Sequence, residues 1–336
     1  MKQPTLAEIA AACGNLSTST VSLALRNSPK IAQATREHVL STARTMGYQP
    51  NRTLSRVMSE IRSGGKQHYK ENIAYLVPHT QGYETAIYRG IHQRAKEIGY
   101  GIERFDLQSS ENHLSGLANK LKARGIRGVI VAPFTQPKSQ LPLDWTKFAG
   151  VCIGYTLSEP NLSRIARDLV HSVRQIFYHL EARGYRKIGF AMQEEHEARM
   201  DYANLSSYLL YEWQSPKNKR VPPLVTKNLD EQRFQTWYAK HRPDLIVTMH
   251  HAIPIWLKNM NIAVPDETGL FVLNTKAPDS KLSGIYPDYE CMGASAVEQV
   301  TSLVERGEFG VPTSPKTILV NGIWIEGTTI TQPPQE

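Results

Sequence analysis

A row of small hydroxyl side chains near the start of the chain could form hydrogen bonds with another molecule. Residues 17–20 read Ser-Thr-Ser-Thr. Ser17 is a typical helix N-cap, and Val21, Ala24 and Leu25 have the spacing of a buried helix face. The outward positions are then Thr18, Ser19, Ser22, Leu23 and Arg26. Side chains of these types on one helix face can contact base edges in the major groove of DNA.

The flanking residues predict two more helices. Thr5-Leu6-Ala7-Glu8 has the spacing of a capping box, so a helix should begin there. Gly14 and Asn15 tolerate positive φ and predict a turn before the hydroxyl-rich helix. A third helix is predicted over Gln33–Met46. This order of parts predicts a helix-turn-helix whose second helix enters the major groove.

The net charge of +8 is concentrated near the amino terminus. Residues 1–70 hold ten basic and three acidic side chains, which leaves a net charge of +1 for the other 266 residues. A basic amino-terminal fifth is typical of a nucleic-acid-binding head, whereas a merely soluble protein would spread its charge more evenly.

A short basic segment follows the three predicted helices. Pro50 can open a helix, and four apolar residues have helical spacing after it: Leu54, Val57, Met58 and Ile61. Arginines lie among them at Arg52, Arg56 and Arg62. Alone, such a segment is typical of a solvated linker. Beside a helix-turn-helix, its arginines can hold phosphates while an apolar side chain enters the minor groove.

The order and spacing of these residues resemble the lac repressor family of bacterial transcription regulators. The matching residues are Thr5-Leu6, Ile9-Ala10, Gly14, Ser17, Thr20-Val21-Ser22, Asn27, Thr35-Arg36-Glu37, Gly47-Tyr48 and Pro50-Asn51. The resemblance implies a headpiece (1–48), a hinge helix and linker (49–68), and a two-lobed effector-binding core (69–336) that dimerises. We expect the first lobe at about 69–157 and 288–314, and the second at about 158–287 and 315–336.

The sequence departs from the family pattern at three places. The turn before Ser17 is one residue longer than usual, and Leu23 stands where the family usually has an arginine. Leu23 can contact a thymine methyl group but cannot form a bidentate bond with guanine. In the hinge segment, counting from Pro50 places Val57 at the minor-groove position, whereas matching the arginine places Met58 there. We favour Met58, because its longer side chain reaches further.

The predicted DNA contacts come from the headpiece and the hinge segment. They are Thr5, Thr18, Ser19, Thr20, Ser22, Leu23, Asn27, Lys30, Thr35, Asn51, Arg52, Arg56, Val57 and Met58.

From Asn72 onward, apolar strands alternate with amphipathic helices, and this rhythm restarts after Pro160. Alternation of this kind predicts the α/β class, with two doubly wound lobes built on parallel sheets. The last predicted strand covers Thr317–Trp324. The family resemblance extends to this core and implies a periplasmic-binding-protein-like fold. Ligands in such sheets bind beyond the carboxyl ends of the strands.

Five residues are predicted to contact an effector in the cleft between the lobes: Tyr83, Phe134, Arg199, Met249 and Asn274. The family often has an arginine at the place of Arg199, although a surface arginine in an acidic loop is the alternative. Tyr83 and Phe134 follow strands and can stack on a ligand or simply pack. Met249 and Asn274 occupy places where the family has polar or acidic residues, which puts a standard sugar site in doubt.

We expect a repressor in a reducing cytoplasm, since no signal-peptide pattern is present and the three cysteines are far apart. The expected partners are a pseudo-palindromic double-stranded DNA operator, a second copy of the chain and a small-molecule effector whose identity the sequence leaves open, a sugar-like molecule being one candidate; no membrane, cofactor or metal is expected. The alternative is a DNA-binding regulator without a small-molecule effector, or one switched by a protein partner. A solute-binding protein is disfavoured by the basic head. An enzyme is disfavoured because no phosphate loop, nucleophile elbow or metal-ligand spacing is found, His250-His251 included.

Overall fold

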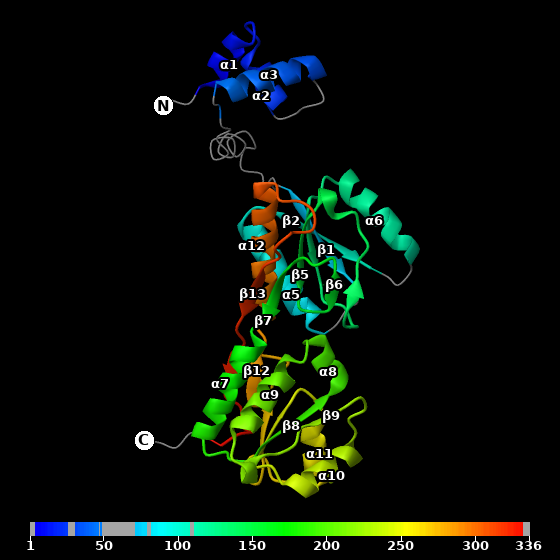
Figure 1. The fold of residues 1–336 in the computed structure, drawn as a ribbon, viewed down its shortest axis with the longest axis vertical. Helices are drawn as coiled ribbons and strands as arrows, with labels where there is room; N and C mark the ends of the chain where they lie inside the picture. Colours follow the sequence, from blue (N-terminus) through cyan, green and yellow to red (C-terminus); the bar gives the residue numbers. More distant parts are fainter. Residues whose placement is uncertain are drawn as a thin grey trace. The chain divides into compact units, whose positions relative to one another are not determined.

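The computed structural model describes residues 4–25, 31–46, 48, 71–78, 82–107 and 111–331. The chain divides into two compact units, Met1–His68 and Tyr69–Glu336 (Figure 1). The described part of the first unit holds three helices: α1 (Leu6–Ala12), α2 (Thr18–Leu25) and α3 (Gln33–Thr45). These bounds agree with the three helices that the sequence predicts.

Local hydrogen bonds explain where the first two helices begin. The Thr5 hydroxyl accepts a bond from the Glu8 backbone N–H at 3.2 Å, and the Glu8 carboxylate accepts one from the Thr5 N–H at 2.6 Å. Gly14 and Asn15 have φ values of 81° and 59°, as the turn requires. Ser17 Oγ accepts a bond from the Thr20 N–H at 3.0 Å and so caps α2. The capping box, the turn and the second cap are therefore confirmed.

One small core holds these helices together. It contains buried apolar residues from all three helices: Ile9, Ala10, Cys13, Val21, Ala24, Val39 and Ala43. Leu25, Met46 and Tyr48 pack against it from its edge. The predicted inward face of α2 is thus confirmed at Val21 and Ala24, and Leu25 is partly buried.

The second unit is built on two six-stranded sheets. The strands of the first sheet are all parallel and are ordered β13-β7-β5-β3-β1-β2. Their bounds are β1 (Asn72–Val77), β2 (Gly101–Asp106), β3 (Gly128–Val131), β5 (Ala149–Ile153), β7 (Ser163–Arg167) and β13 (Thr317–Val320). The helices beside this sheet are α5 (Glu84–Glu97), α6 (Glu111–Ala123) and α12 (Tyr289–Arg306). A small two-stranded sheet joins β4 (Ser139–Gln140) and β6 (Leu157–Glu159).

The second sheet has the order β14-β12-β11-β10-β8-β9, and its β14 is antiparallel to β12. Its strands are β8 (Ile188–Gln193), β9 (Leu224–Thr226), β10 (Leu245–Thr248), β11 (Gly269–Val272), β12 (Gly284–Tyr286) and β14 (Ile323–Ile325). Its helices are α7 (Leu169–Ala182), α8 (Glu194–Arg199), α9 (Ala203–Gln214), α10 (Glu231–His241) and α11 (Ile253–Asn259).

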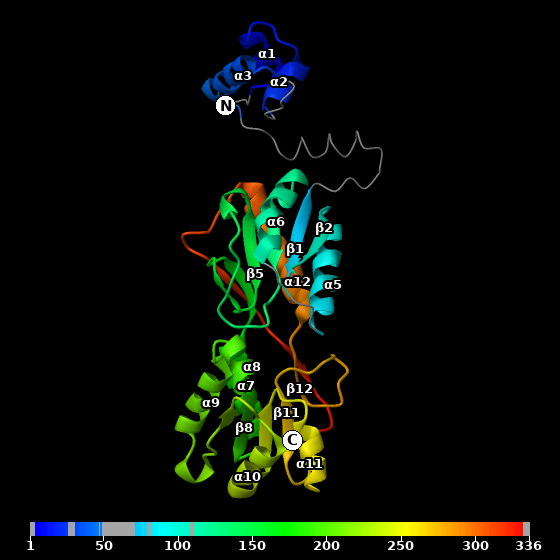
Figure 2. The same ribbon diagram turned by 90° about the vertical axis from the view of Figure 1, so that its right-hand side faces the viewer.

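Both sheets follow the same winding. In each, the first strand of the lobe lies between the second and third strands of that lobe, so the crossover direction reverses at the first strand. Helices cover both faces of each sheet, as Figures 1 and 2 show: α5 and α12 lie opposite α6 in the first lobe, and α7 and α9 lie opposite α10 and α11 in the second. The predicted α/β class with two doubly wound lobes is confirmed.

The expected lobe boundaries differ from the observed sheets in two places. We placed residues 158–287 and 315–336 in the second lobe, but β7 and β13 belong to the first sheet. The predicted single strand over Thr317–Trp324 is also wrong, because it is divided into β13 and β14, which lie in different sheets. Gly322 lies between them, and a Cβ atom there would overlap the Ile285 side chain. The chain therefore crosses between the lobes after β7, after β12 and after β13.

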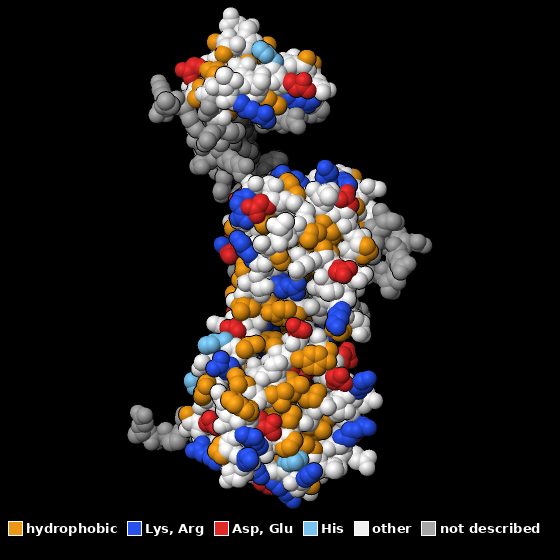
Figure 3. All heavy atoms as spheres, in the orientation of Figure 1, with side chains coloured by type: hydrophobic (Ala, Val, Ile, Leu, Met, Phe, Trp, Pro, Cys, Tyr) orange, Lys and Arg blue, Asp and Glu red, His pale blue; other side chains and the backbone are white. Residues whose placement is uncertain are grey.

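The surface of the second lobe carries a group of exposed apolar side chains, visible as an orange area in Figure 3. On α7 and α9 these residues are Val170, Tyr178, Leu209, Leu210 and Trp213. Apolar surface gathered in one place is typical of a contact surface between proteins. None of the helices in the described part of the chain combines the length and apolar character needed to span a bilayer.

Candidate nucleic-acid interface and ligand pocket

The outward face of α2 presents the predicted hydroxyl groups. Thr18 and Ser19 are exposed, whereas Thr20, Ser22 and Leu23 are half-buried. Ser19 Oγ lies 2.7 Å from Ser17 Oγ, so the capping residue also orients Ser19. No acidic residue occupies the first turn of α2, and the partial positive charge of that helix end favours a nearby phosphate.

The other predicted DNA contacts fall into two groups. Thr5 is exposed at the start of α1, and Thr35 is half-buried in the first turn of α3. The remaining residues lie outside the described part of the chain and stay predictions: Asn27, Lys30, Asn51, Arg52, Arg56, Val57 and Met58.

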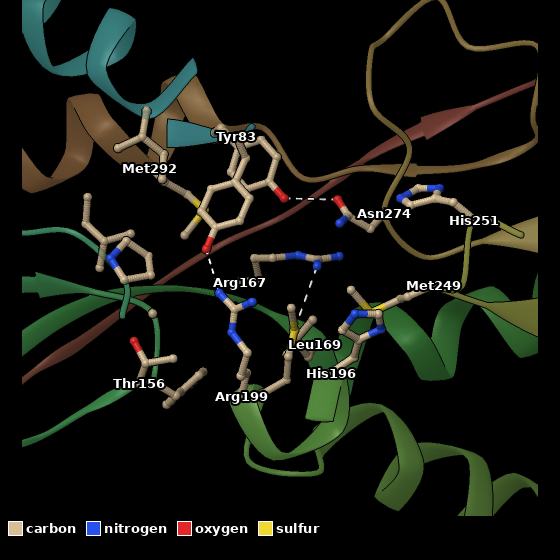
Figure 4. Close-up of a pocket in the computed structure, with 17 residues that line it drawn as sticks. Tyr83, Thr156, Arg167, Leu169, His196, Arg199, Met249, His251, Asn274 and Met292 are labelled. Carbon is tan, nitrogen blue, oxygen red and sulfur yellow. Dashed lines mark hydrogen bonds between the residues drawn. The ribbon is translucent and has the colours of Figure 1, made fainter. Parts of the chain in front are cut away.

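A pocket of about 240 Å³ lies between the two lobes of the second unit (Figure 4). Four of the five predicted effector-binding residues line it: Tyr83, Arg199, Met249 and Asn274. Tyr83 comes after β1, Arg199 after β8, Met249 after β10 and Asn274 after β11. The pocket therefore lies where loops leave the carboxyl ends of the strands of both sheets, as the doubly wound fold predicts.

Arg199 ends the short helix α8 and reaches across the pocket to the first lobe. Its Nη2 donates a hydrogen bond to Tyr83 Oη at 2.7 Å and another to the Phe134 carbonyl at 3.4 Å. Arg199 therefore lines the pocket and does not lie free on the surface of an acidic loop, while its contact with an effector stays a prediction. Burial raises the pKa of Tyr83, and the Arg199 charge opposes that rise.

The structure does not bring the Phe134 side chain into the pocket. That ring packs against the apolar cluster between the first sheet and α6. Its backbone instead faces the site, because its N–H donates to Thr156 Oγ1 at 2.8 Å and its carbonyl accepts from Arg199. Of the two readings that the sequence left open for Phe134, the structure favours packing.

Arg167 was missed by the sequence interpretation, although it lines the same pocket. It is the last residue of β7, and its Nη2 donates to the Leu273 carbonyl of the second lobe at 2.8 Å. Its Nη1 lies 3.9 Å from the sulfur of Met200. Burial lowers the pKa of Arg167. Strand β7 was not among the predicted strands, so no pattern in the sequence placed this arginine near the cleft.

Tyr289 was also missed, and it supplies an aromatic wall. Its ring stacks on Tyr83, with the centroids 5.1 Å apart and the planes inclined by 15°. Its hydroxyl donates to Asn274 Oδ1 at 2.9 Å, which joins the first turn of α12 to the loop after β11. Burial raises the pKa of Tyr289 to about 12, so its phenol is neutral and can donate at pH 7.

Histidines complete the polar lining. His196 and His251 line the pocket, whereas His250 stacks on Trp256 with a centroid distance of 4.8 Å. His250 and His251 thus face different surroundings, as expected for adjacent residues at a strand end. Burial is the largest cause that lowers the pKa of all three rings, so they are neutral at pH 7. Within the described residues, no group of three metal-ligating side chains comes together.

Comparisons with known proteins agree with this architecture. Residues 5–51 match the family described as bacterial regulatory proteins, lacI family, and residues 177–330 match the periplasmic binding protein-like domain. The transcriptional regulator MalR of Staphylococcus xylosus is 28% identical over 193 residues, which are 56% of this chain. The chain spans 56% of the length of that relative.

Solved structures share the fold over 77–98% of the chain. The complex of the transcriptional regulator CelR with cellobiose aligns with a TM-score of 0.58 and 16% identity over 97% of this chain and 100% of that one. The lac repressor dimer bound to operator and the anti-inducer ONPF aligns with a TM-score of 0.58 and 17% identity over 98% of this chain and 100% of that one. The regulator CCPA from Weissella paramesenteroides, with bound glucose, aligns with a TM-score of 0.55 and 13% identity over 77% of this chain and 98% of that one.

The two matched regions correspond to the two units of the structure. The first covers helices α1 to α3 and their turn, and the second covers most of the lobe that carries Arg199 and Asn274 together with α12 and β13 of the other lobe. A helix-turn-helix of this family thus precedes a periplasmic-binding-protein-like core in one chain. The chain thus combines a domain similar to the lacI family of bacterial regulatory proteins with a periplasmic binding protein-like domain, the two parts that the resemblance to the lac repressor family implies.

Proposed function

We propose that this chain is a sequence-specific DNA-binding transcription repressor whose affinity for its operator is set by a small molecule bound between the lobes. The observation that carries the proposal is the joint presence of an exposed hydroxyl face on α2 and an interlobe pocket lined at its centre by Arg167 and Arg199. In this proposal the chain is not an enzyme, and it acts in the cytoplasm, where its DNA is.

The headpiece reads the DNA. The exposed hydroxyls of Thr18 and Ser19 meet base edges, and Leu23 contacts apolar parts of the groove. Two headpieces on a homodimer then bind a pseudo-palindromic site, because a twofold axis in the protein requires one in the DNA. The apolar surface over α7 and α9 is available for self-association.

The core controls the headpiece through the separation of the lobes. A ligand that binds one arrangement of the lobes more tightly shifts the population toward that arrangement. The segment 49–68 then docks on DNA only when the two cores of the dimer hold the right separation. Couplings of this kind are typically about 1–3 kcal/mol.

The test is a DNA-binding titration by fluorescence anisotropy, with an operator selected from random duplex DNA by the full chain. We expect the affinity to fall steeply with salt, because each phosphate contact releases counterions. A chain lacking residues 1–68 should lose the affinity, and mass photometry should show a dimer. Equal operator binding by the shortened and the full chain would refute the proposal.

A further inference from the structure

Two guanidinium groups point into one pocket. Arg167 enters from the end of β7 in the first lobe, and Arg199 enters from the end of α8 in the second (Figure 4). Each reaches a hydrogen-bond acceptor on the opposite lobe, Leu273 for Arg167 and Tyr83 for Arg199. The pocket therefore places two positive charges close to one small volume.

No aspartate or glutamate is among the residues that line this pocket in the described part of the chain. Arg167 forms no ion pair with a described carboxylate, and its guanidinium contacts a backbone carbonyl and a thioether sulfur. Burying a cation without an opposite charge costs free energy. An anion supplied from outside would remove that cost.

Two other partly buried arginines of the core are paired with carboxylates. Arg104 meets the buried carboxylate of Glu84 at 3.0 Å, and Arg183, whose side chain is 12% exposed, meets Glu326 at 2.7 Å. The contrast with Arg167 is informative, because the fold provides a carboxylate for these arginines and a ligand cavity for Arg167.

We propose that the interlobe pocket binds a small organic anion, whose carboxylate or phosphate group lies between Arg167 and Arg199. The proposal deepens the proposed function, since it rests on this pocket being the effector site and names the charge class of the effector. A guanidinium binds either anion through charge-assisted hydrogen bonds, which are stronger than the bond to the neutral Leu273 carbonyl that Arg167 makes in this structure.

The rest of the pocket fits the body of such a molecule. Its volume of about 240 Å³ lies below the roughly 300–1,000 Å³ usual for ligand pockets, so a molecule with a single ring fits best. The stacked rings of Tyr83 and Tyr289 form an aromatic wall. Among the described residues, the buried Nδ1 of His196 has no hydrogen-bond partner, and it can bond to a polar group of the ligand.

The experiment measures ligand-induced thermal stabilisation of the full chain at constant ionic strength. The minimal probes are inorganic phosphate and acetate, with chloride as the reference salt. Two matched pairs follow: glucose 6-phosphate against glucose, and glucuronate against glucose. We expect at least one anionic probe to raise the melting temperature of the core above its chloride or neutral counterpart, because a ligand that binds only the folded state stabilises it. The phosphate and carboxylate arms separate the two sources of the anion.

Variants link the effect to the pocket. Arg167→Gln should weaken binding of the active anion at least tenfold, and Arg167→Lys should restore part of it. Arg89→Gln is the control, because Arg89 is a 65% exposed arginine of the same lobe. If Arg167→Gln fails to fold, Arg199→Gln serves in its place. The control also removes the contribution of anions that bind the basic headpiece.

Two outcomes overturn the proposal: no probe anion stabilises the chain beyond its counterpart, or Arg167→Gln and Arg199→Gln retain full anion binding. DNA titrations separate this failure from that of the proposed function. An anion that binds through Arg167 without changing operator affinity supports the anion site and contradicts its role as effector site. If the chain binds its operator but no anion stabilises the core, only the anion site is contradicted, and the proposed DNA-binding function stands.

Discussion

Arg199 of the second lobe donates a 2.7 Å hydrogen bond to the Tyr83 hydroxyl of the first lobe. Arg167 makes the reverse connection, from the first lobe to the Leu273 carbonyl of the second. The two arginines thus span the pocket in opposite directions. A ligand that takes a guanidinium group into its own hydrogen bonds must compete with a contact between the lobes. Binding in the pocket and lobe separation are therefore physically coupled.

The bond between Arg199 and Tyr83 can be removed with little change in shape. Tyr83→Phe deletes the hydroxyl and keeps the ring stacked on Tyr289. We expect the core to lose about 1 kcal/mol, the usual net value of one such bond. For a unit of this size that loss corresponds to about 2–4 °C in melting temperature, measured by calorimetry. Tyr178→Phe is the control, because the Tyr178 side chain on α7 is exposed. Equal melting temperatures for Tyr83→Phe and the unaltered chain would contradict a stabilising contact.

The headpiece could be predicted from the sequence nearly residue by residue. Its structure is fixed by local chemistry, since Thr5 and Glu8 cap each other, Gly14 and Asn15 adopt left-handed backbone angles, and Ser17 caps the next helix. Each of these interactions spans three residues or fewer, so sequence spacing is sufficient to find them.

The pocket could be predicted only in part. Tyr83, Met249 and Asn274 follow strands with clear apolar runs, and the family resemblance indicated Arg199. Arg167 was missed because β7 has a single clear apolar pair, Ile165-Ala166, between polar residues. Tyr289 was missed because it is the first residue of α12 and precedes the run of buried apolar positions that marks this helix in the sequence. Strands β13 and β14 near the end of the chain join different sheets, and which sheet each joins depends on pairing with strands far away in the sequence. The spacing of residues along the chain does not reveal this pairing.

Ser17 and Thr18 separate helix stability from base recognition. Ser17→Ala removes the N-cap of α2 and should cost the headpiece about 1 kcal/mol. Thr18→Ala leaves that cap in place, so it should not alter headpiece stability but should weaken binding to the selected operator about 2–10-fold. Hydrogen exchange of residues 4–25 and anisotropy titrations measure the two effects. If Thr18→Ala leaves both the affinity and the ratio of specific to non-specific binding unaltered, Thr18 does not read bases.

The hinge segment offers a choice between two residues. Val57→Asp and Met58→Asp should each weaken operator binding, because a charged side chain cannot enter a minor-groove base step. The larger loss should follow Met58→Asp, since we assign the minor-groove position to Met58. Calorimetry should show an unaltered core in both variants. Unchanged operator affinity in both would exclude an apolar wedge in this segment, and a larger loss for Val57→Asp would move the assignment to Val57.

The buried histidines make core stability depend on pH. Burial lowers the pKa of His196, His250 and His251 below the ordinary value of 6.5. Below pH 6.5 the unfolded chain therefore binds more protons at these sites than the folded chain, and stability falls as the pH decreases. Glu197, whose pKa is raised by burial, acts in the opposite sense at lower pH. The test therefore compares how much the melting temperature changes with pH in the unaltered chain and in a histidine variant.

His196→Gln should show a smaller decrease in melting temperature between pH 7 and pH 5.5 than the unaltered chain. The exposed residue His171 supplies the control, because His171→Gln should leave the decrease unchanged. Identical pH profiles for all three proteins would show that His196 is not the group that couples protonation to core stability.

The closest helix packing of the core gives the last prediction. Gly90 of α5 faces the start of α12, and a Cβ atom there would overlap the backbone carbonyl of Glu290. Gly90→Ala should therefore force the two helices apart and cost about 1–3 kcal/mol, as overpacking usually does. Gly116 in α6 is the matched control, because a Cβ atom there has no neighbour within 4 Å.

Gly116→Ala should instead stabilise the core by about 0.5–1 kcal/mol, since alanine loses less backbone entropy in a helix. Opposite shifts in melting temperature for the two glycine variants are the expected calorimetric result. Because α12 begins at Tyr289, which stacks on Tyr83 and bonds to Asn274, displacing α12 should also disturb the pocket. Gly90→Ala should accordingly weaken anion binding as well as stability, and a variant that melts early but binds the anion normally would separate the helix packing from the site.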